Sequence, residues 1–459
     1  MTAQKPHRSG GRVALWATLI LVALLLSGLL GFALAGGFSG GGAGDSDARQ
    51  PTLPRGQPAT GHWARQRASS AEKDARKELT DEQRAKIEEL SALGYAGGVQ
   101  PGPANSGVTA YDREHTAPGY NLYVSGHARE AILIDLEGQP LHRWQVPELT
   151  KGRDQEAVMS EGDVLLQPRH DFLSVVHLYE NGDLLAVLGN TGISKVDRDS
   201  NVIWERANGS HHDASVAEDG TIYVLTLEAL VMPEIHPTEP VLIDSITVLD
   251  PDGNELNRLS IYAALRDSEF SPLLQYRPGF GDFLHTNTIE VLDGRLESRS
   301  PAFRRGNVLI SIKHMSTIAV VDLEAGKVVW ALAGHWLWQH RPTVLDNGHI
   351  LIFDNLGGRR DLGASRVIEF DPFSQENVWI YEGTPGNILR SVANGTVQRL
   401  PNGNTLIVES HNGRALEVTP EKQIVWEFVN PHRAAEDEGL IAVLFDLVRL
   451  PPGFPTDWL

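Results

Sequence analysis

The sequence contains no cysteine. This absence excludes disulfide bonds, metal sites with thiolate ligands and a cysteine nucleophile. Histidines, carboxylates and hydroxyl groups are therefore the side chains left for reactive chemistry. The chain holds 17 histidines, so the search for a reactive site starts with them.

Basic residues are scarce relative to acidic ones. The chain has 40 lysines and arginines against 59 aspartates and glutamates, which leaves a formal net charge of −19. A nucleic-acid partner requires a concentrated basic surface that neutralises phosphates. The charge balance therefore argues against nucleic-acid binding.

The N-terminal region combines basic residues with an uncharged apolar stretch. The stretch covers residues 13–38, and no acidic residue precedes Asp45. By the positive-inside rule, residues 1–12 stay in the cytoplasm and the rest of the chain is exported. The apolar run is long enough for a transmembrane anchor, although Ala33-Leu34-Ala35 resembles a signal-peptidase site. We expect a single-pass protein of the inner cell membrane whose main domain faces the periplasm or the cell exterior.

Residues 39–117 are predicted to form a flexible linker. Its first part is rich in Gly, Pro, Ser and Ala, which cannot bury a core. A short helix is expected near residues 80–93, because Thr80 and Gln83 have the spacing of a capping box and apolar residues follow at helical spacing. This helix is expected to act as a spacer that packs on the main domain. Alternatively, it or the transmembrane helix binds a protein partner.

One phrase recurs six times after about residue 120: a hydrophobic strand, an Asp-centred turn and a strand that ends on Trp. Leu259 replaces the Trp once, and Thr419 replaces the Asp once. Repeats of roughly 40–50 residues with short strands and Gly turns are typical of propeller blades. We predict an all-β fold, a six-bladed β-propeller over residues 118–459, in which the Trp side chains pack between blades. The six copies span Asp135–Trp144, Asp197–Trp204, Asp250–Leu259, Asp322–Trp330, Asp371–Trp379 and Thr419–Trp426.

Two further segments are predicted from this repeat. The third interval is the longest, and its surplus at about residues 261–282 is expected to form a loop or a short helix near the mouth of the site. The C-terminal residues 444–450 are expected to return to the first blade and close the ring, which would remove exposed sheet edges.

Three histidines occupy matching positions in different repeats. His212 and His340 lie eight residues before the Gly of a turn, and His285 lies nine residues before one. Matching positions of successive blades converge on the central channel of a propeller. Converging imidazoles are suited to group transfer. They also suit a divalent metal, with His211 or His314 as a further ligand.

A longer series of motifs surrounds these histidines and resembles the arylsulfotransferase family over about residues 210–426. The resemblance implies a six-bladed propeller, export, and transfer of a sulfuryl group from an aryl sulfate to a phenol through a sulfated histidine. It implies no nucleotide cofactor, and no cofactor or catalytic metal is expected. The motifs are Phe283–Ile289, Gly306–Asp322, Gly326–Trp330, Gln339-His340, Gly348–Asn355, Ser365-Arg366 and Gln398–Thr405.

The same resemblance implies roles for individual residues. His340 of the Gln-His motif would be the nucleophile. The acid–base or oxyanion-stabilising residues would be His285, His212 and His211. The substrate-binding residues would be Lys313, Asn287, Asp354 and Asn355. The family usually has Arg where this chain has Lys313, so a mobile point charge replaces a planar fork that can hold two sulfuryl oxygens.

Several assignments have alternatives at this stage. Trp336, Trp338 and Phe353 are candidates for an aryl pocket, or they pack between blades. Asp354-Asn355 is also typical of a turn held by side-chain hydrogen bonds. Two other functions stay open: a metal site with histidine ligands on the propeller axis, and a membrane-attached binding or assembly scaffold without chemistry.

Overall fold

The computed structural model describes most of the chain after residue 97. All of the described residues belong to one compact unit, residues 59–459. The predicted cytoplasmic segment and transmembrane anchor, residues 1–38, lie outside the described residues. No helix in the described part is long and apolar enough to cross a membrane. The described residues are 80, 83, 98–150, 172–279, 281–358, 363–384, 386–434 and 439–459.

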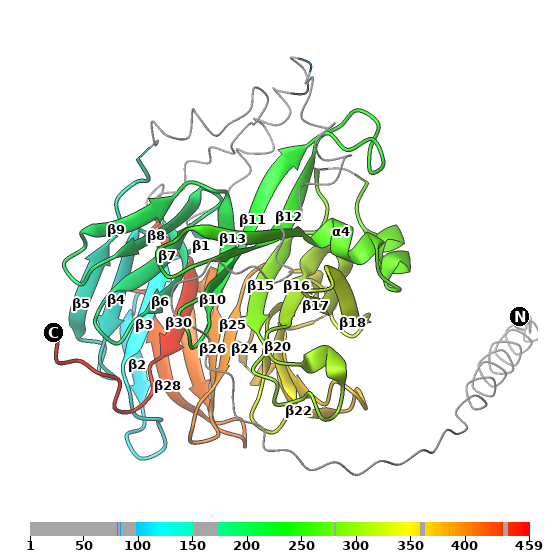
Figure 1. Cartoon of the computed structure of the whole chain (residues 1–459). Coiled ribbons are helices and arrows are strands. Elements are labelled where there is room, and N and C mark those ends of the chain that lie inside the picture. Colours follow the sequence, from blue (N-terminus) through cyan, green and yellow to red (C-terminus); the bar gives the residue numbers. More distant parts are fainter. Residues whose placement is uncertain are drawn as a thin grey trace, which may run out of the picture. The chain divides into compact units, whose positions relative to one another are not determined.

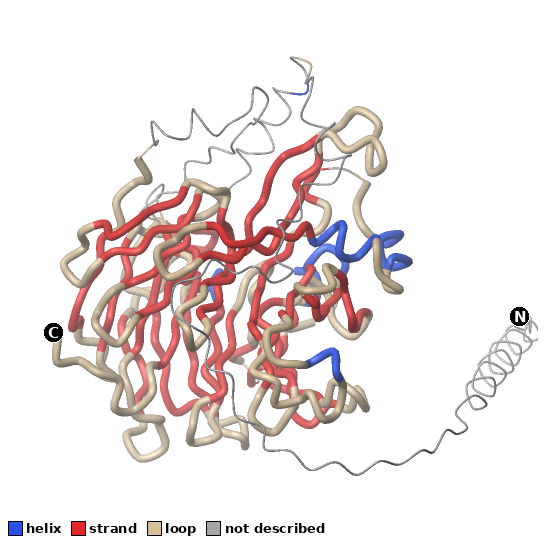
Figure 2. Tube along the Cα trace, viewed as in Figure 1, coloured by secondary structure: helices blue, strands red, loops and turns tan. Residues whose placement is uncertain are grey.

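Six sheets of four or five strands follow one another along the described chain (Figure 1). Strands dominate the trace, and helices are short (Figure 2). The first sheet joins β30 (Leu444–Arg449) to β3 (Asn121–Ser125), β4 (Glu130–Ile134) and β5 (Pro140–Gln145). The second consists of β6 (Leu173–Leu178), β7 (Leu184–Leu188), β8 (Gly192–Val196) and β9 (Val202–Arg206).

The other four sheets repeat this order. The third consists of β10 (Ser210–Val216), β11 (Ile222–Leu230), β12 (Val241–Leu249) and β13 (Glu255–Ser260), with β14 (Gly281–Asp282) paired to β12. The fourth consists of β15 (Thr286–Val291), β16 (Val308–Ile312), β17 (Thr317–Asp322) and β18 (Lys327–Ala333). The fifth consists of β19 (His340–Val344), β20 (Ile350–Asp354), β21 (Arg366–Phe370) and β22 (Asn377–Tyr381). The sixth consists of β25 (Thr396–Arg399), β26 (Thr405–Glu409), β27 (Arg414–Val418) and β28 (Ile424–Val429), with β2 (Gly107–Tyr111) at its edge.

The first strands of these sheets contact one another in a closed circle. β6 contacts β10, β10 contacts β15, and β15 contacts β19; β19 then contacts β25, β25 contacts β30, and β30 contacts β6. The six sheets are therefore the blades of one propeller, and these six strands surround its axis. The predicted six-bladed all-β fold is confirmed.

The ring closes with strands from opposite ends of the propeller sequence. β30 pairs antiparallel with β3, with Asn121 opposite Arg449, so the predicted return of residues 444–450 to the first blade is confirmed. The predicted linker, however, extends too far. β1 (Gly98–Pro101) pairs with β29 (Leu440–Ala442), and β2 pairs with β28. Val108 and Tyr111 of β2 pack against the apolar core of the last blade, which explains why this stretch is ordered.

The recurring Asp-to-Trp phrase forms the outer hairpin of each blade. Its Trp side chains hold neighbouring blades together, because each of four indole N–H groups donates to a backbone carbonyl in a turn of the next blade. The predicted packing role of these residues is thereby confirmed. The pairs are Trp144 to Gly182 at 3.0 Å, Trp204 to Pro251 at 3.1 Å, Trp379 to Pro420 at 2.9 Å and Trp426 to Leu136 at 2.9 Å.

Loss of one of these indole groups has a measurable cost. Trp426 is 0% exposed, so Trp426→Phe should lower the free energy of unfolding by about 1–3 kcal/mol, because the Leu136 carbonyl loses its donor and the smaller ring leaves a void. Trp379→Phe is the matched control, since that half-buried indole makes the same contact and should cost less. Chemical denaturation of both variants measures the difference, and equal losses would contradict the packing account.

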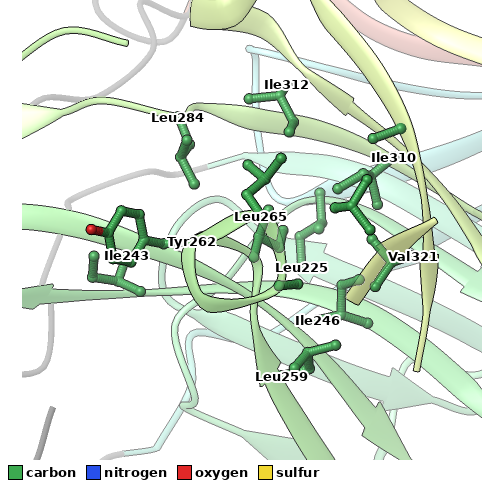
Figure 3. Packing of buried hydrophobic residues seen from close by; sticks show 14 of the residues in the cluster. Leu225, Ile243, Ile246, Leu259, Tyr262, Leu265, Leu284, Ile310, Ile312 and Val321 are labelled. Carbon is green, nitrogen blue, oxygen red and sulfur yellow. The ribbon is translucent and has the colours of Figure 1, made fainter. Parts of the chain in front are cut away.

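The one repeat that lacks Trp has a helix in its place. Leu259 packs in an apolar cluster between the third and fourth blades that also contains Leu265 of helix α4 (Ile261–Arg266) and Ile310 (Figure 3). Ser260 begins α4 by accepting a hydrogen bond from the Ala263 N–H. The turn η1 (Ser271–Tyr276) and β14 complete this segment. The predicted loop or helix at residues 261–282 is therefore confirmed.

Of the helix predicted near residues 80–93, the structure describes only residues 80 and 83. Thr80 N–H donates to Gln83 Oε1 at 2.9 Å, and Gln83 N–H donates to Thr80 Oγ1 at 3.2 Å. These reciprocal bonds are the expected capping box. Gln83 Nε2 also donates to the Thr238 carbonyl of the propeller at 2.9 Å. The rest of that helix lies outside the described residues, and its role as a spacer or partner site stays a prediction.

Candidate active site

A cavity lies on the propeller axis, where all six innermost strands or their flanking residues contribute to its wall. The predicted site residues His212, Asn287 and His340 line it. Arg341 also lines it, but Arg341 donates to Asp213 at 2.6 Å and to Asp446 at 3.0 Å, so its charge is already balanced. The other lining residues are Ser174, Val175, Thr288, Ala393, Asn394, Gly395, Thr396 and Phe445.

Backbone conformation helps to orient the residues at this cavity. His212, His285 and Arg341 have φ values of 54°, 52° and 50°, a left-handed conformation that is uncommon outside glycine. His212 and Arg341 fall within register shifts of β10 and β19, respectively, and His285 directly precedes β15. Bulges re-aim side chains, and unusual φ values gather at functional sites. Local strain therefore coincides with the cavity at His212 and Arg341, and with the neighbouring His285.

The predicted histidines converge. His211 Nδ1 lies 2.6 Å from His212 Nδ1, and His212 Nε2 lies 3.2 Å from His285 Nε2. Lys313 Nζ lies 3.2 Å from the same His285 nitrogen. His340 lines the same cavity as His212. Burial lowers the pKa of His340 well below its ordinary value, and the nearby charges of Lys313 and His285 lower it further. His340 is therefore a neutral imidazole at neutral pH.

The hydrogen bonds of Asn355 determine which nitrogen of His340 carries the lone pair. Asn355 Nδ2 donates to the Ser391 carbonyl at 2.8 Å and to the Asn394 carbonyl at 2.9 Å. Its Oδ1 is therefore the acceptor for His340 Nδ1–H at 2.7 Å. Neutral His340 consequently has its free lone pair on Nε2. Asn355, expected at a substrate-binding position, instead lies behind His340 and positions it.

Removal of this acceptor should impair His340 without removing it. Asn355→Leu keeps the approximate volume but cannot accept the Nδ1 proton, so the imidazole can rotate or take the other tautomer. If an aryl sulfate is the substrate, as the family resemblance implies, its kcat should fall by about 10²-fold, with KM nearly unchanged. Asn355→Asp, which still accepts this hydrogen bond, should lose less activity. Equal losses in the two variants would show that Asn355 matters only for folding.

Lys313 begins the turn η3 (Lys313–Met315), directly after the second strand of the fourth blade. Burial lowers the pKa of Lys313 to about 8, although nearby Asp282 opposes the shift. Its ammonium lies 5.2 Å from the centre of the Trp338 ring. Lys313 is thus a cation at neutral pH that lies between an imidazole and an aromatic face.

The three aromatic candidates for an aryl pocket separate in the structure. Trp336 packs against Phe370 between blades, and Phe353 is 0% exposed in the core. Only Trp338 approaches the histidine cluster, 6.2 Å from His314 between ring centres, and its φ of 59° is another left-handed value. Packing is therefore the role of Trp336 and Phe353, and Trp338 remains the aryl-pocket candidate.

Asp354 does not face the cavity as a substrate ligand would. Its Oδ1 accepts from Leu337 N–H at 3.0 Å and Leu356 N–H at 2.9 Å, and its Oδ2 accepts from Arg366 Nε at 2.8 Å. This fully buried carboxylate holds the turn after β20 and the segment before His340. The alternative interpretation, a turn held by side-chain hydrogen bonds, describes Asp354 correctly.

Asn287 keeps a place in the cavity wall, but its amide also joins two blades. Asn287 Nδ2 donates to the Gln339 carbonyl at 2.9 Å, and Gln339 Nε2 donates to Ser311 Oγ at 3.0 Å and to the Thr317 carbonyl at 2.9 Å. The Gln-His and His-x-Asn motifs therefore meet between the fourth and fifth blades. This contact holds the backbone of His340 against the blade that carries Lys313.

Two aspartates near the histidines were missed from the sequence. Asp282 pairs through Oδ2 with His285 Nδ1. Although burial opposes the shift, the charge and hydrogen bond of His285 lower the pKa of Asp282 below its ordinary value. Asp244 Oδ2 accepts from the Thr286 N–H at 2.7 Å, and its Oδ1 lies 3.7 Å from His211 Nε2. Neither aspartate belongs to a repeated motif, so no sequence signal marked them.

One group of side chains has the spacing of a metal site. Potential ligand atoms of Asp282, His285 and His314 all lie within 4.8 Å of one another. Imidazole and carboxylate ligands suit several divalent metals. The Lys313 ammonium, 3.2 Å from His285 Nε2, would repel a cation there. Lys313 therefore disfavours a divalent cation at this cluster.

Comparison with known proteins gives a family and distant structural likenesses. A protein of unknown function from Bacteroides caccae matches at 13% identity over 72% of this chain and 98% of its own, with a TM-score of 0.46. The WD40 β-propeller domain of Doa1 matches at 14% identity over 78% of this chain and 96% of its own, with a TM-score of 0.41. The curated proteins searched gave no match.

The family comparison covers the blades that carry the histidine cluster. A model of the arylsulfotransferase (ASST) family matches residues 175–431. This range begins in the second blade and includes every residue predicted for the site. Because the match spans more than half of the chain, this protein belongs to the arylsulfotransferase family.

Proposed function

We propose that this protein transfers a sulfuryl group from an aryl sulfate to a phenol through a covalent intermediate on His340. Family membership supports a sulfotransferase. The observation that carries the specific mechanism is the Asn355 contact, which leaves the lone pair of neutral His340 on Nε2 at the axial cavity. Sulfuryl transfer, like phosphoryl transfer, depends mainly on positioning and on cationic cover for the transferred oxygens.

In the first half-reaction, His340 Nε2 attacks the sulfur of the aryl sulfate. A bond forms between nitrogen and sulfur, and the bond between sulfur and the aryl oxygen breaks, with its electron pair passing to that oxygen. His285, protonated on Nε2, gives its proton to the oxygen, so that a neutral phenol leaves. The Lys313 ammonium balances negative charge on the sulfuryl oxygens. His212, which also lines the cavity, contacts His285, and His211 contacts His212.

In the second half-reaction, an acceptor phenol attacks the same sulfur. Its proton passes to His285 Nε2, the nitrogen–sulfur bond breaks, and the lone pair returns to His340. Both substrates carry an aromatic ring, and Trp338 beside Lys313 offers a face on which a ring can stack. Neither half-reaction requires a nucleotide or a metal, because the aryl sulfate itself supplies the activated group.

The proposal also includes export and a membrane anchor. The basic residues before the uncharged stretch at 13–38 support an orientation with the propeller outside the cytoplasm. Protease treatment of intact cells, whose outer envelope has been opened, checks this orientation. Digestion of the propeller only after lysis of the inner membrane would contradict it.

The test of the enzymatic proposal uses the purified full-length chain. A chromogenic aryl sulfate should be consumed faster when a phenol is added, and mass spectrometry should detect protein carrying one extra SO3 group at His340. A protein with neither turnover nor adduct would support the scaffold instead. The metal alternative rests on the spacing of Asp282, His285 and His314. In that case a chelator would abolish activity, whereas sulfuryl transfer through His340 continues in its presence.

A further inference from the structure

A line of titratable side chains extends from the active site into the third blade. It begins at Asp282, continues through His285, His212 and His211, and ends at Asp244 on the buried strand β12. The contact atoms are His285 Nδ1 with Asp282 Oδ2, His285 Nε2 with His212 Nε2, His212 Nδ1 with His211 Nδ1, and His211 Nε2 with Asp244 Oδ1. Each imidazole thus uses both of its nitrogens within the line.

The inner end of this line is fully enclosed. His211 is 1% exposed and Asp244 is 2% exposed. His211 Nε2 is a buried polar atom with no hydrogen-bond partner among the described residues, and Asp244 Oδ1 lies 3.7 Å from it. A buried polar nitrogen without a partner is destabilising, because it has lost its hydrogen bonds to water. A movement of about 1 Å would bring the pair to hydrogen-bond distance, so this arrangement points to a contact that forms at some stage of the reaction.

We propose that Asp244, His211 and His212 form a proton relay, buried at its inner end, that loads and unloads His285. This inference rests on the proposed function, in which His285 donates a proton to one phenol and accepts a proton from another. It assigns a role to Asp244, which touches no substrate. Asp244 stores a proton, and the two histidines conduct it.

The relay follows from the proton count of neutral imidazoles. Burial lowers the pKa of His211 to about 3 and that of His212 well below its ordinary value, so both rings are neutral at neutral pH. A neutral imidazole has one N–H and one lone pair. The short contact between the two Nδ1 atoms therefore contains one proton, held by one ring or the other. The two choices define two complete arrangements of the line.

In the first arrangement, Asp244 carries a proton, His211 is protonated on Nδ1, and His212 is protonated on Nε2. His285 is then neutral and keeps only its Nδ1 proton, which faces Asp282. In the second arrangement, three protons have moved. The Asp244 proton has passed to His211 Nε2, and the Nδ1 proton of His211 has passed to His212 Nδ1. The Nε2 proton of His212 has passed to His285 Nε2. Both relay histidines remain neutral. The net result is an Asp244 carboxylate and a His285 imidazolium.

The surroundings allow both arrangements to exist near neutral pH. Burial and the nearby charge of Asp282 raise the pKa of Asp244 to about 7, so its carboxyl group can hold the stored proton. The Asp282 carboxylate on one side of His285 attracts a proton to this ring, whereas the Lys313 ammonium beside Nε2 repels it. A bound sulfuryl anion next to Lys313 offsets that repulsion and draws the proton toward His285. Substrate binding would therefore trigger the transfer.

The test compares leaving groups of different basicity in the Asp244→Asn variant. Because the Thr286 N–H faces residue 244, the asparagine should direct its side-chain oxygen to Thr286 and its NH2 group to His211 Nε2. The relay then stays in its first arrangement, in which His285 has no proton on Nε2. Phenyl sulfate, whose leaving group is basic, should lose about 10²-fold in kcat/KM. p-Nitrophenyl sulfate, whose leaving group needs no proton, should change by less than about threefold. Equal losses, or no loss for either ester, would overturn the relay.

Two further measurements separate this result from misfolding and from failure of the proposed function. Asp250→Asn makes the same substitution directly after strand β12, in an exposed turn, and should affect neither ester. Nitrogen-15 NMR of histidine-labelled full-length protein reads the tautomer of His211 without any turnover. Above pH 7 the wild type should carry the His211 proton on Nε2, whereas Asp244→Asn should keep it on Nδ1. The same tautomer in both proteins would overturn the relay, even if no aryl sulfate proved to be a substrate.

Discussion

His340→Ala should abolish transfer of sulfuryl groups, with a fall in turnover of about 10³-fold or more, because the covalent route has no other nucleophile of matching geometry. Asn355 accepts the Nδ1 proton of His340 and donates its own two N–H groups to carbonyls. Among the described residues, no other imidazole has a side-chain amide fixed in this way at Nδ1. The SO3 adduct should disappear from the mass spectrum at the same time. Turnover of a chromogenic aryl sulfate measures the loss.

Two controls keep this expectation testable. His115→Ala removes an exposed imidazole that pairs with Asp112 outside the cavity lining, and it should leave turnover unchanged. Free imidazole added to His340→Ala should restore part of the activity if the cavity stays intact. An adduct that persists in His340→Ala, together with turnover within about tenfold of the wild type, would assign the nucleophile to another residue.

Lys313→Ala should lower kcat/KM by about 10²- to 10³-fold, by analogy with the loss of one oxyanion donor. The wild type should also lose kcat/KM as the pH rises through about 8, because Lys313 then gives up its proton and no longer balances the sulfuryl charge. Below this pH the ammonium persists and that contribution is complete. A pH profile of kcat/KM with an aryl sulfate checks the position and the sign of this limb.

Lys313→Arg discriminates between two explanations of the lysine. The guanidinium remains charged at all relevant pH values and presents a fork to two oxygens. If Lys313 is the sulfuryl anchor, the variant should retain or gain activity, and its kcat/KM should no longer fall as the pH rises through about 8. The same fall of kcat/KM in the variant would show that the titration of another group causes it. If both Lys313→Arg and the wild type were completely inactive, the result would favour a cavity that binds a different ligand and does not transfer sulfuryl groups.

The propeller was predictable because its signals are local and repeated. Each Asp-to-Trp phrase contains the turn and the aromatic residue of one hairpin, so six copies predicted six blades without knowledge of their packing. Residues 98–111 lack that phrase and follow a Gly- and Pro-rich stretch, so β1 and β2 were mistaken for linker. Their strand structure comes from pairing with β29 and β28, more than 300 residues away along the chain.

The convergence of His212, His285 and His340 was also predictable, because matching positions in a repeat share a position around the axis. The side-chain contacts within the site were not. Asp354 and Asn355 stand beside one another in a motif associated with substrate, yet one holds a turn and the other holds His340. The direction of each side chain depends on carbonyls and N–H groups that other strands supply.

The amino-acid sequence by itself determined the blade repeat, the absence of thiol chemistry and the set of histidines that reach the axis, because these depend on residue type and on spacing along the chain. Only the tertiary structure decided the lone pair of His340, the place of Asp282 beside His285 and that of Asp244 behind His211. Hydrogen bonds act over about 3 Å, and the groups that orient Asn355 and Asp244 come from other segments of the chain. Asp282 lies only three residues before His285, but its position depends on the pairing of β14 with β12. Spacing along the sequence cannot specify such contacts, whereas the folded backbone brings the atoms together.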